Sequence, residues 1–169
     1  MKRIASILIT TSRVISRLVA NLCVGLIFVM LALLVTQVLM RYFLGAPPSW
    51  TEELAIILFA WLVLLYATVG LHEGFHVAID TIPARHERLR VWADRWVAAL
   101  AILFGWVTLT AGIAYVERTA GQSTAALQMP IEVLYLCVPV CGALFVLHGV
   151  ARLIAPAPTN PALPNEAPA

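Results

Sequence analysis

The chain alternates four long apolar segments with shorter polar ones. The charge-free segments are residues 18–40, 54–71, 96–116 and 133–151, which have 23, 18, 21 and 19 residues. Each matches the roughly 17–25 residues that an α-helix needs to cross about 30 Å of hydrocarbon. The pattern predicts an all-α integral membrane protein with four transmembrane helices, at about residues 18–42, 50–72, 88–118 and 131–154.

The predicted membrane domain, residues 18–154, is flanked by two different segments. In residues 1–17, apolar side chains recur at helical spacing between basic ones, which predicts a short amphipathic lead-in at the cytoplasmic interface. A frayed basic tail is the alternative. Residues 155–169 are rich in proline and nearly uncharged, so we expect a disordered cytoplasmic tail. Within the fourth helix, Pro139 predicts a kink.

Basic residues are concentrated on one side of the predicted membrane. That side has nine of them, and the other has only Arg41 and Arg118; the nine are Lys2, Arg3, Arg13, Arg17, Arg85, Arg88, Arg90, Arg95 and Arg152. Because cytoplasmic segments carry the excess of Lys and Arg, both termini and the connection between helices 2 and 3 are predicted to face the cytoplasm.

Candidate chemistry changes this picture little. Of the residues, 62% are hydrophobic and 12% charged, which is far from the usual composition of a soluble domain. The sequence has no nucleophile elbow, phosphate-binding glycine loop or zinc-protease motif, and no charged residue at the centre of a predicted helix. We therefore expect neither an enzyme nor a bound cofactor, and nothing suggests a nucleic-acid partner. Ion pumps usually need intramembrane charges or broken helices, so we do not expect this chain alone to act as a pump.

Two histidines offer an alternative of a different class. His72 and His148 are placed at similar depth on predicted helices 2 and 4, as the ligands are in four-helix membrane cytochromes. A haem-binding cytochrome subunit of b type is therefore one alternative function. A general assembly factor that needs no partner is another. Paired small residues, Gly105 with Gly112 and Gly142 with Gly149, indicate faces where helices approach closely.

Several short motifs occur in a fixed order along the four predicted helices. Arg41-Tyr42 is followed by a short loop and by Trp50-Thr51-Glu52-Glu53, and Trp61 and Gly70 come later in helix 2. The turn Gly74-Phe75-His76-Val77-Ala78-Ile79-Asp80 comes next, and Thr124, Pro130, Tyr135 and Pro139 lead into helix 4. In this order the sequence resembles the small membrane subunit of tripartite ATP-independent periplasmic (TRAP) transporters, over about residues 18–154.

The resemblance implies a function as well as a fold. It implies a non-catalytic scaffold in the bacterial inner membrane that supports a large multi-helix permease. The transporter would be sodium-coupled, carry organic acid anions, and receive substrate from a periplasmic binding protein that docks transiently. On this reading, membrane lipids are the remaining partner.

The resemblance also assigns roles to residues. Arg41, Tyr42, Trp50, Glu52 and Glu53 would anchor helices 1 and 2 at the periplasmic face, and His76 and Asp80 would fix the cytoplasmic turn after Gly74. The other candidates for structural or partner contacts are Trp61, Thr124, Pro130, Tyr135 and Pro139. Two positions depart from the family pattern: Ala125 replaces a common proline, and Glu132 a common aromatic residue.

Overall fold

The computed structural model of the protein describes residues 2–45, 48–73 and 87–154, and most of these residues are helical. The helices are α1 (Lys2–Leu44), α2 (Ser49–Glu73), α3 (Glu87–Thr119), α4 (Glu132–Tyr135) and α5 (Cys137–Ile154). Four stretches are long and apolar enough to cross a membrane: Ser6–Phe43, Ser49–Glu73, Trp92–Thr119 and Glu132–Ile154, the last made of α4 and α5. The predicted four-helix membrane fold is therefore confirmed, and we treat the chain as a multi-pass membrane protein.

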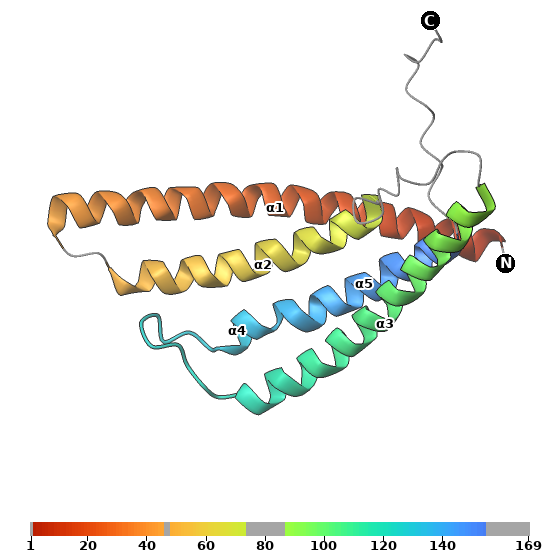
Figure 1. Ribbon diagram of the computed structural model, residues 1–169. Coiled ribbons are helices and arrows are strands. Elements are labelled where there is room, and N and C mark those ends of the chain that lie inside the picture. The colour runs from red at the N-terminus through yellow and green to blue at the C-terminus, as the bar shows by residue number, and fades with distance from the viewer. Residues whose placement is uncertain (1, 46–47, 74–86, 155–169) are drawn as a thin grey trace, which may run out of the picture.

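The long helices lie side by side in a row rather than around a central axis (Figure 1). α1 packs against α2, α2 against α5, and α5 against α3, and the contact between α3 and α5 is the most extensive. A smaller contact joins α1 directly to α5. In its most apolar stretch, α1 has only 6% of its residues buried, compared with 33% in α2. A row of this kind leaves most apolar side chains facing outward, toward lipid or another protein.

Close packing of α3 on α5 depends on glycines that face each other. A Cβ atom on Gly142 would lie 2.5 Å from the backbone nitrogen of Leu109 and 2.8 Å from the carbonyl oxygen of Gly105. A Cβ on Gly112 would lie 2.8 Å from the ring of Pro139. The glycine faces expected from the sequence therefore meet each other within this chain, as in other small-residue helix contacts.

α1 is one continuous helix of 43 residues, about 65 Å long at 1.5 Å per residue. No break separates a lead-in of residues 1–17 from the spanning helix, so that boundary stays a prediction. Ser12 and Ser16 are buried in this first part, whereas Arg13 and Arg17, which follow them directly, are exposed. These two basic side chains therefore face away from the other helices.

The fourth membrane segment is interrupted at Leu136, which separates α4 from α5. Pro139 follows three residues later and is buried. Because proline has no amide hydrogen and its ring crowds the carbonyl four residues earlier, the helical hydrogen bond to Tyr135 is missing at this turn. The structure thus interrupts the helix three residues before Pro139, and the kink at Pro139 itself stays a prediction.

The ends of the helices form two groups, which we name the loop end and the histidine end after the residues found there. At the loop end, the end of α1 and the start of α2 lie on the same side as residues 120–131, which join α3 to α4 (Figure 1). At the histidine end are Ser12, His72 and His148, which contact one another. Gly45 ends α1 with a positive φ of 68°, a conformation that suits glycine after the last helical turn.

Candidate functional site

Residues 120–131 form a compact turn at the loop end. Backbone hydrogen bonds join Thr124 N to Met129 O at 2.9 Å and Ile131 N to Gln122 O at 3.0 Å, around an isolated bridge between Ser123 and Pro130. The buried hydroxyl of Thr124 accepts a further bond from Met129 N. Thr124 and Pro130, both predicted site residues, therefore help to shape this loop.

Glu53 on α2 binds the tip of this loop. Its Oε2 atom accepts hydrogen bonds from the backbone nitrogens of Ala126, at 3.1 Å, and Leu127, at 2.7 Å. A carboxylate that accepts two amide bonds makes one of the stronger kinds of hydrogen-bonded contact. Glu53 thus links the start of α2 to the loop between α3 and α4, which lies more than 70 residues away in the chain.

Glu52, the neighbouring carboxylate, points toward α1 instead. Its Oε1 atom accepts a 3.3 Å hydrogen bond from Gln37 Nε2 and lies 3.9 Å from Arg41 Nη2. Both side chains of the Arg41–Glu52 pair are more than half exposed, so this pair contributes little to stability. Tyr42 and Trp50 are also exposed, and Thr51 is buried, with its hydroxyl donating to Pro48 O at 2.7 Å.

Two further side chains hold α2 and the loop to the fourth segment. Trp61 Nε1 donates a 2.9 Å hydrogen bond to the carbonyl oxygen of Val133. Glu132 is one of the two residues that depart from the family pattern. Its Oε1 atom accepts a 2.8 Å hydrogen bond from Gly121 N. Glu132 therefore stabilises the loop by joining its end to Gly121 near its start.

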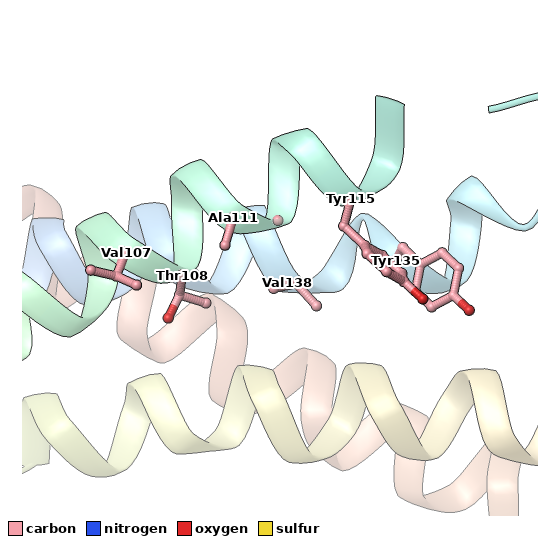
Figure 2. A pocket seen from close by; sticks show the side chains of 7 residues that line it. Val107, Thr108, Ala111, Tyr115, Tyr135 and Val138 are labelled. Atoms are coloured by element: carbon pink, nitrogen blue, oxygen red, sulfur yellow. The ribbon is translucent and has the colours of Figure 1, made fainter. Parts of the chain in front are cut away.

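A cavity of about 490 Å³ lies beside this region, between α3 and the fourth segment (Figure 2). Val107, Thr108, Ala111, Gly112, Tyr115, Tyr135 and Val138 line it. The rings of Tyr115 and Tyr135 meet edge to face, with centroids 4.6 Å apart. The lining carries hydroxyl groups but no charged side chain, so it offers an organic anion no cationic partner.

At the histidine end, Ser12 lies between the two histidines. Its Oγ atom is 2.7 Å from His148 Nδ1 and 3.2 Å from His72 Nδ1, and the imidazole centroids are 5.2 Å apart. We call Ser12, His72 and His148 the serine–histidine cluster. Because both rings turn the same kind of nitrogen toward one serine oxygen, they do not face each other across a space for a porphyrin. This geometry does not support the haem alternative.

Arg152 joins three helices near this cluster. From α5, its Nη1 donates to the carbonyl oxygen of Leu71 in α2 at 2.9 Å, and its Nη2 lies 3.1 Å from Asp94 Oδ1 in α3. The arginine side chain is 8% exposed. From the sequence, Arg152 was predicted only to be one of the cytoplasmic basic residues. No pattern of neighbouring residues indicates its contacts with Leu71 and Asp94.

Three of the predicted site residues are not described by the structure, and two contact residues were not predicted. Gly74, His76 and Asp80 lie outside the described residues, so their predicted roles in the cytoplasmic turn stay predictions. Ser12 and Ser16 were missed as contact residues. Their four-residue spacing is a small-residue pattern typical of close helix contacts, and this was the signal available in the sequence.

Comparison with known proteins agrees with this geometry. The model of the family described as tripartite ATP-independent periplasmic transporters, DctQ component, matches residues 30–159. The C4-dicarboxylate TRAP transporter small permease protein DctQ of Rhodobacter capsulatus is 31% identical over 59% of this chain and 45% of its own length. The sialic acid TRAP transporter small permease protein SiaQ of Vibrio cholerae is 25% identical over 83% of this chain and 82% of its own.

A third relative is longer. The isethionate TRAP transporter permease protein DctMQ of Oleidesulfovibrio alaskensis is 29% identical over 57% of this chain, a match that covers 16% of that protein. This chain spans less than half of the Rhodobacter relative as well. The family model nevertheless covers most of the present sequence, including the loop that Glu53 and Glu132 bind. The chain therefore belongs to the DctQ family, the small permease subunits of TRAP transporters.

Proposed function

We propose that this chain is the non-catalytic scaffold subunit of a sodium-coupled TRAP transporter for organic acid anions, and that it supports a large permease subunit. The observation that carries the proposal is the family match over residues 30–159. A scaffold role fits the helices themselves, because their central parts hold no Asp, Glu, Lys or Arg that could bind an ion or a charged substrate.

The arrangement of the helices supports a large protein partner. A single row leaves two broad apolar faces, and α1 contributes almost no buried residues to the row. The name of the Oleidesulfovibrio relative, a permease protein DctMQ, describes one longer chain of which only a part matches this one. We infer that the present chain associates with a separate large permease through one face of the row, with lipid on the other.

The substrate class is inferred from the relatives. Their names specify a C4-dicarboxylate, sialic acid and isethionate, which are all organic acids. The cavity lined by Tyr115 and Tyr135 has no cationic group, so we assign substrate and sodium binding to the large permease. A periplasmic binding protein would deliver the substrate.

The proposed orientation follows from the basic residues. We place the chain in the bacterial inner membrane with both termini and the histidine end toward the cytoplasm, because cytoplasmic segments carry the excess of Lys and Arg. The loop end, with Glu53 and residues 120–131, then faces the periplasm. Exposed Arg13 and Arg17 on α1 would lie at the cytoplasmic headgroups.

Affinity purification from native membranes tests the proposal directly. The tagged chain, extracted in mild detergent, is expected to bring down a large multi-helix permease in roughly equal amount, identified by mass spectrometry. The same sample should show no haem absorption band. A chain that elutes alone, or one that is coloured by haem, would contradict the scaffold assignment.

Replacing Glu53 by alanine is expected to reduce transport without removing the protein from the membrane. The substitution leaves the amides of Ala126 and Leu127 without their carboxylate partner, so the loop tip should lose its fixed position against α2. We expect substrate uptake by cells that express the full transporter to fall several-fold. Uptake of labelled substrate, with immunoblots of membrane fractions, measures both quantities.

Glu52 provides a matched control for this experiment. It is the adjacent carboxylate, yet its contacts with Gln37 and Arg41 are long and exposed. Glu52→Ala should therefore leave uptake close to that of the unmodified chain. Equal losses in both variants would mean that negative charge near the start of α2, rather than the loop contact, is what matters.

A further inference from the structure

The serine–histidine cluster has no part in the proposed scaffold role, although its buried members are among the least exposed polar groups in the described part of the chain. Ser12 is fully buried and His148 is 1% exposed. We propose that the cluster is a proton-sensitive contact that attaches the first part of α1 to the cytoplasmic ends of α2 and α5. This proposal does not depend on the identity of the permease or of its substrate.

The hydrogen count of the cluster limits its neutral forms. A serine hydroxyl donates one hydrogen bond and can accept two, and a neutral imidazole carries its hydrogen on one ring nitrogen only. Both imidazoles can therefore bond to Ser12 Oγ in two ways: one Nδ1 donates to the oxygen while the other accepts from the hydroxyl, or both Nδ1 atoms donate to the oxygen. Since at most one Nδ1 can accept from the hydroxyl, at least one of His72 and His148 carries its hydrogen on Nδ1.

One added proton is compatible with this arrangement. If His72 takes the proton, its Nδ1 donates to Ser12 and Ser12 donates to His148 Nδ1, so both bonds remain. His72 is the partly exposed member of the pair, which lets water solvate the rest of its ring. A singly protonated cluster therefore keeps the contact.

A second proton destabilises this arrangement. Both Nδ1 atoms would then donate to one oxygen, whose own hydrogen has to turn away, and two positive rings would lie with centroids 5.2 Å apart. In addition, His148 Nε2 is buried and no described residue bonds to it, so a positive His148 ring would have a buried N–H without an acceptor. A buried charge without partners is costly, and the cluster should separate so that water can reach the rings.

The surrounding charges do not compensate for the second proton. Arg152 on α5 lies one turn beyond His148, and Arg13 on α1 follows Ser12 in the chain. The nearby carboxylates are Glu73, next to His72 on α2, and Asp94 on α3, which is already paired with Arg152. Protonation of Asp94 is the other acid-sensitive event at this end, and the test must distinguish it.

Separation of the cluster would free the first part of α1. Among residues 6–20, only Ser12 and Ser16 are buried, so these two small side chains make the main contact of that segment with the other helices. As the first part of α1, this segment can open locally while the rest of the helix stays folded. Its backbone amides should therefore exchange hydrogen faster once the contact is lost.

Hydrogen–deuterium exchange of the full chain in lipid nanodiscs, followed by mass spectrometry, tests the proposal. Peptides from residues 6–20 are compared at pH 8 and pH 5, on either side of about 6.5, the ordinary pKa of histidine. The variants are His72→Gln and His148→Gln. Each leaves one histidine, so neither cluster can hold two positive rings.

At pH 5, exchange in residues 6–20 is expected to be about tenfold faster in the unmodified chain than in either glutamine variant at the same pH. At pH 8 the three proteins should agree. Ser12→Ala should exchange faster at both values, and residues 120–131 serve as an internal reference. If one glutamine variant loses helical circular dichroism, the other still supplies the comparison, because each removes one of the two charges.

Two results would overturn the proposal. One is an unmodified chain whose residues 6–20 stay equally protected at pH 5. The other is acid-induced exchange of the same size in both glutamine variants, which would move the acid response to another group. Asp94→Asn at pH 8 then shows whether loss of the Asp94–Arg152 pair alone frees the segment.

Discussion

Gly142→Val is expected to prevent α3 and α5 from packing and to remove most folded protein. A Cβ atom at this position would already lie 2.5 Å from the backbone nitrogen of Leu109, and a branched side chain requires far more room. Since backbone atoms cannot move aside as a side chain can, the helices must separate. Overpacking of this kind costs about 3 kcal/mol or more. Fluorescence-detected size exclusion after heating measures the loss.

Gly25 on α1 is the matched control for this substitution. A Cβ atom there would meet no heavy atom within 4 Å. Gly25→Val should therefore leave the melting temperature nearly unchanged, although it adds the same side chain to a membrane helix. Gly142→Ala should fall between the two. A Gly142→Val protein that melts like the unmodified chain would show that α3 and α5 are not in close contact.

Replacing Arg152 by leucine is expected to cause the second largest loss of stability. The change leaves the carbonyl oxygen of Leu71 and the carboxylate of Asp94 without their shared donor, and so detaches α5 from both neighbours at the histidine end. Removing one partner of a largely buried ion pair costs several kcal/mol, and the partial exposure of Asp94 reduces this to about 2–3 kcal/mol. Thermal unfolding in detergent reports the change.

The control for Arg152 is Arg95, which follows Asp94 on α3 and is exposed. Arg95→Leu removes the same charge from the same end of the molecule and should have little effect. Arg152→Lys keeps the charge but cannot present two separate donors to Leu71 and Asp94, so an intermediate stability is expected. Equal stability of Arg152→Leu and Arg95→Leu would refute the role of the three-helix contact.

The four membrane helices could be predicted because bilayer thickness fixes the length of an apolar segment. The helix is also interrupted near Pro139, where the chemistry of proline predicts a kink. Glycines spaced seven apart indicated close helix faces, but spacing along one helix does not identify the partner. Only the structure shows that Gly105 and Gly142 face each other, since this depends on how the helices are arranged in three dimensions.

The contacts that define the candidate site were beyond sequence reasoning. Glu53 and the loop at Ala126 are separated by 73 residues, and no local pattern relates two positions that far apart. The order of motifs singled out Glu53 and Thr124, but not that the two belong to one structure. Ser12 was missed for another reason. A serine next to an arginine, here Arg13, is typical of a polar surface, but the structure buries Ser12 against two histidines.

The three-helix contact of Arg152 also has a consequence for how the protein is made. Ribosomes synthesise a chain from its N-terminus, so the α1–α2 hairpin enters the membrane well before Arg152, which lies 81 residues after its partner Leu71. Until α5 is inserted, Asp94 remains unpaired and the glycine face of α3 is uncovered. A chain released too early therefore displays both features, and a membrane protease or chaperone could distinguish it from a finished subunit by them.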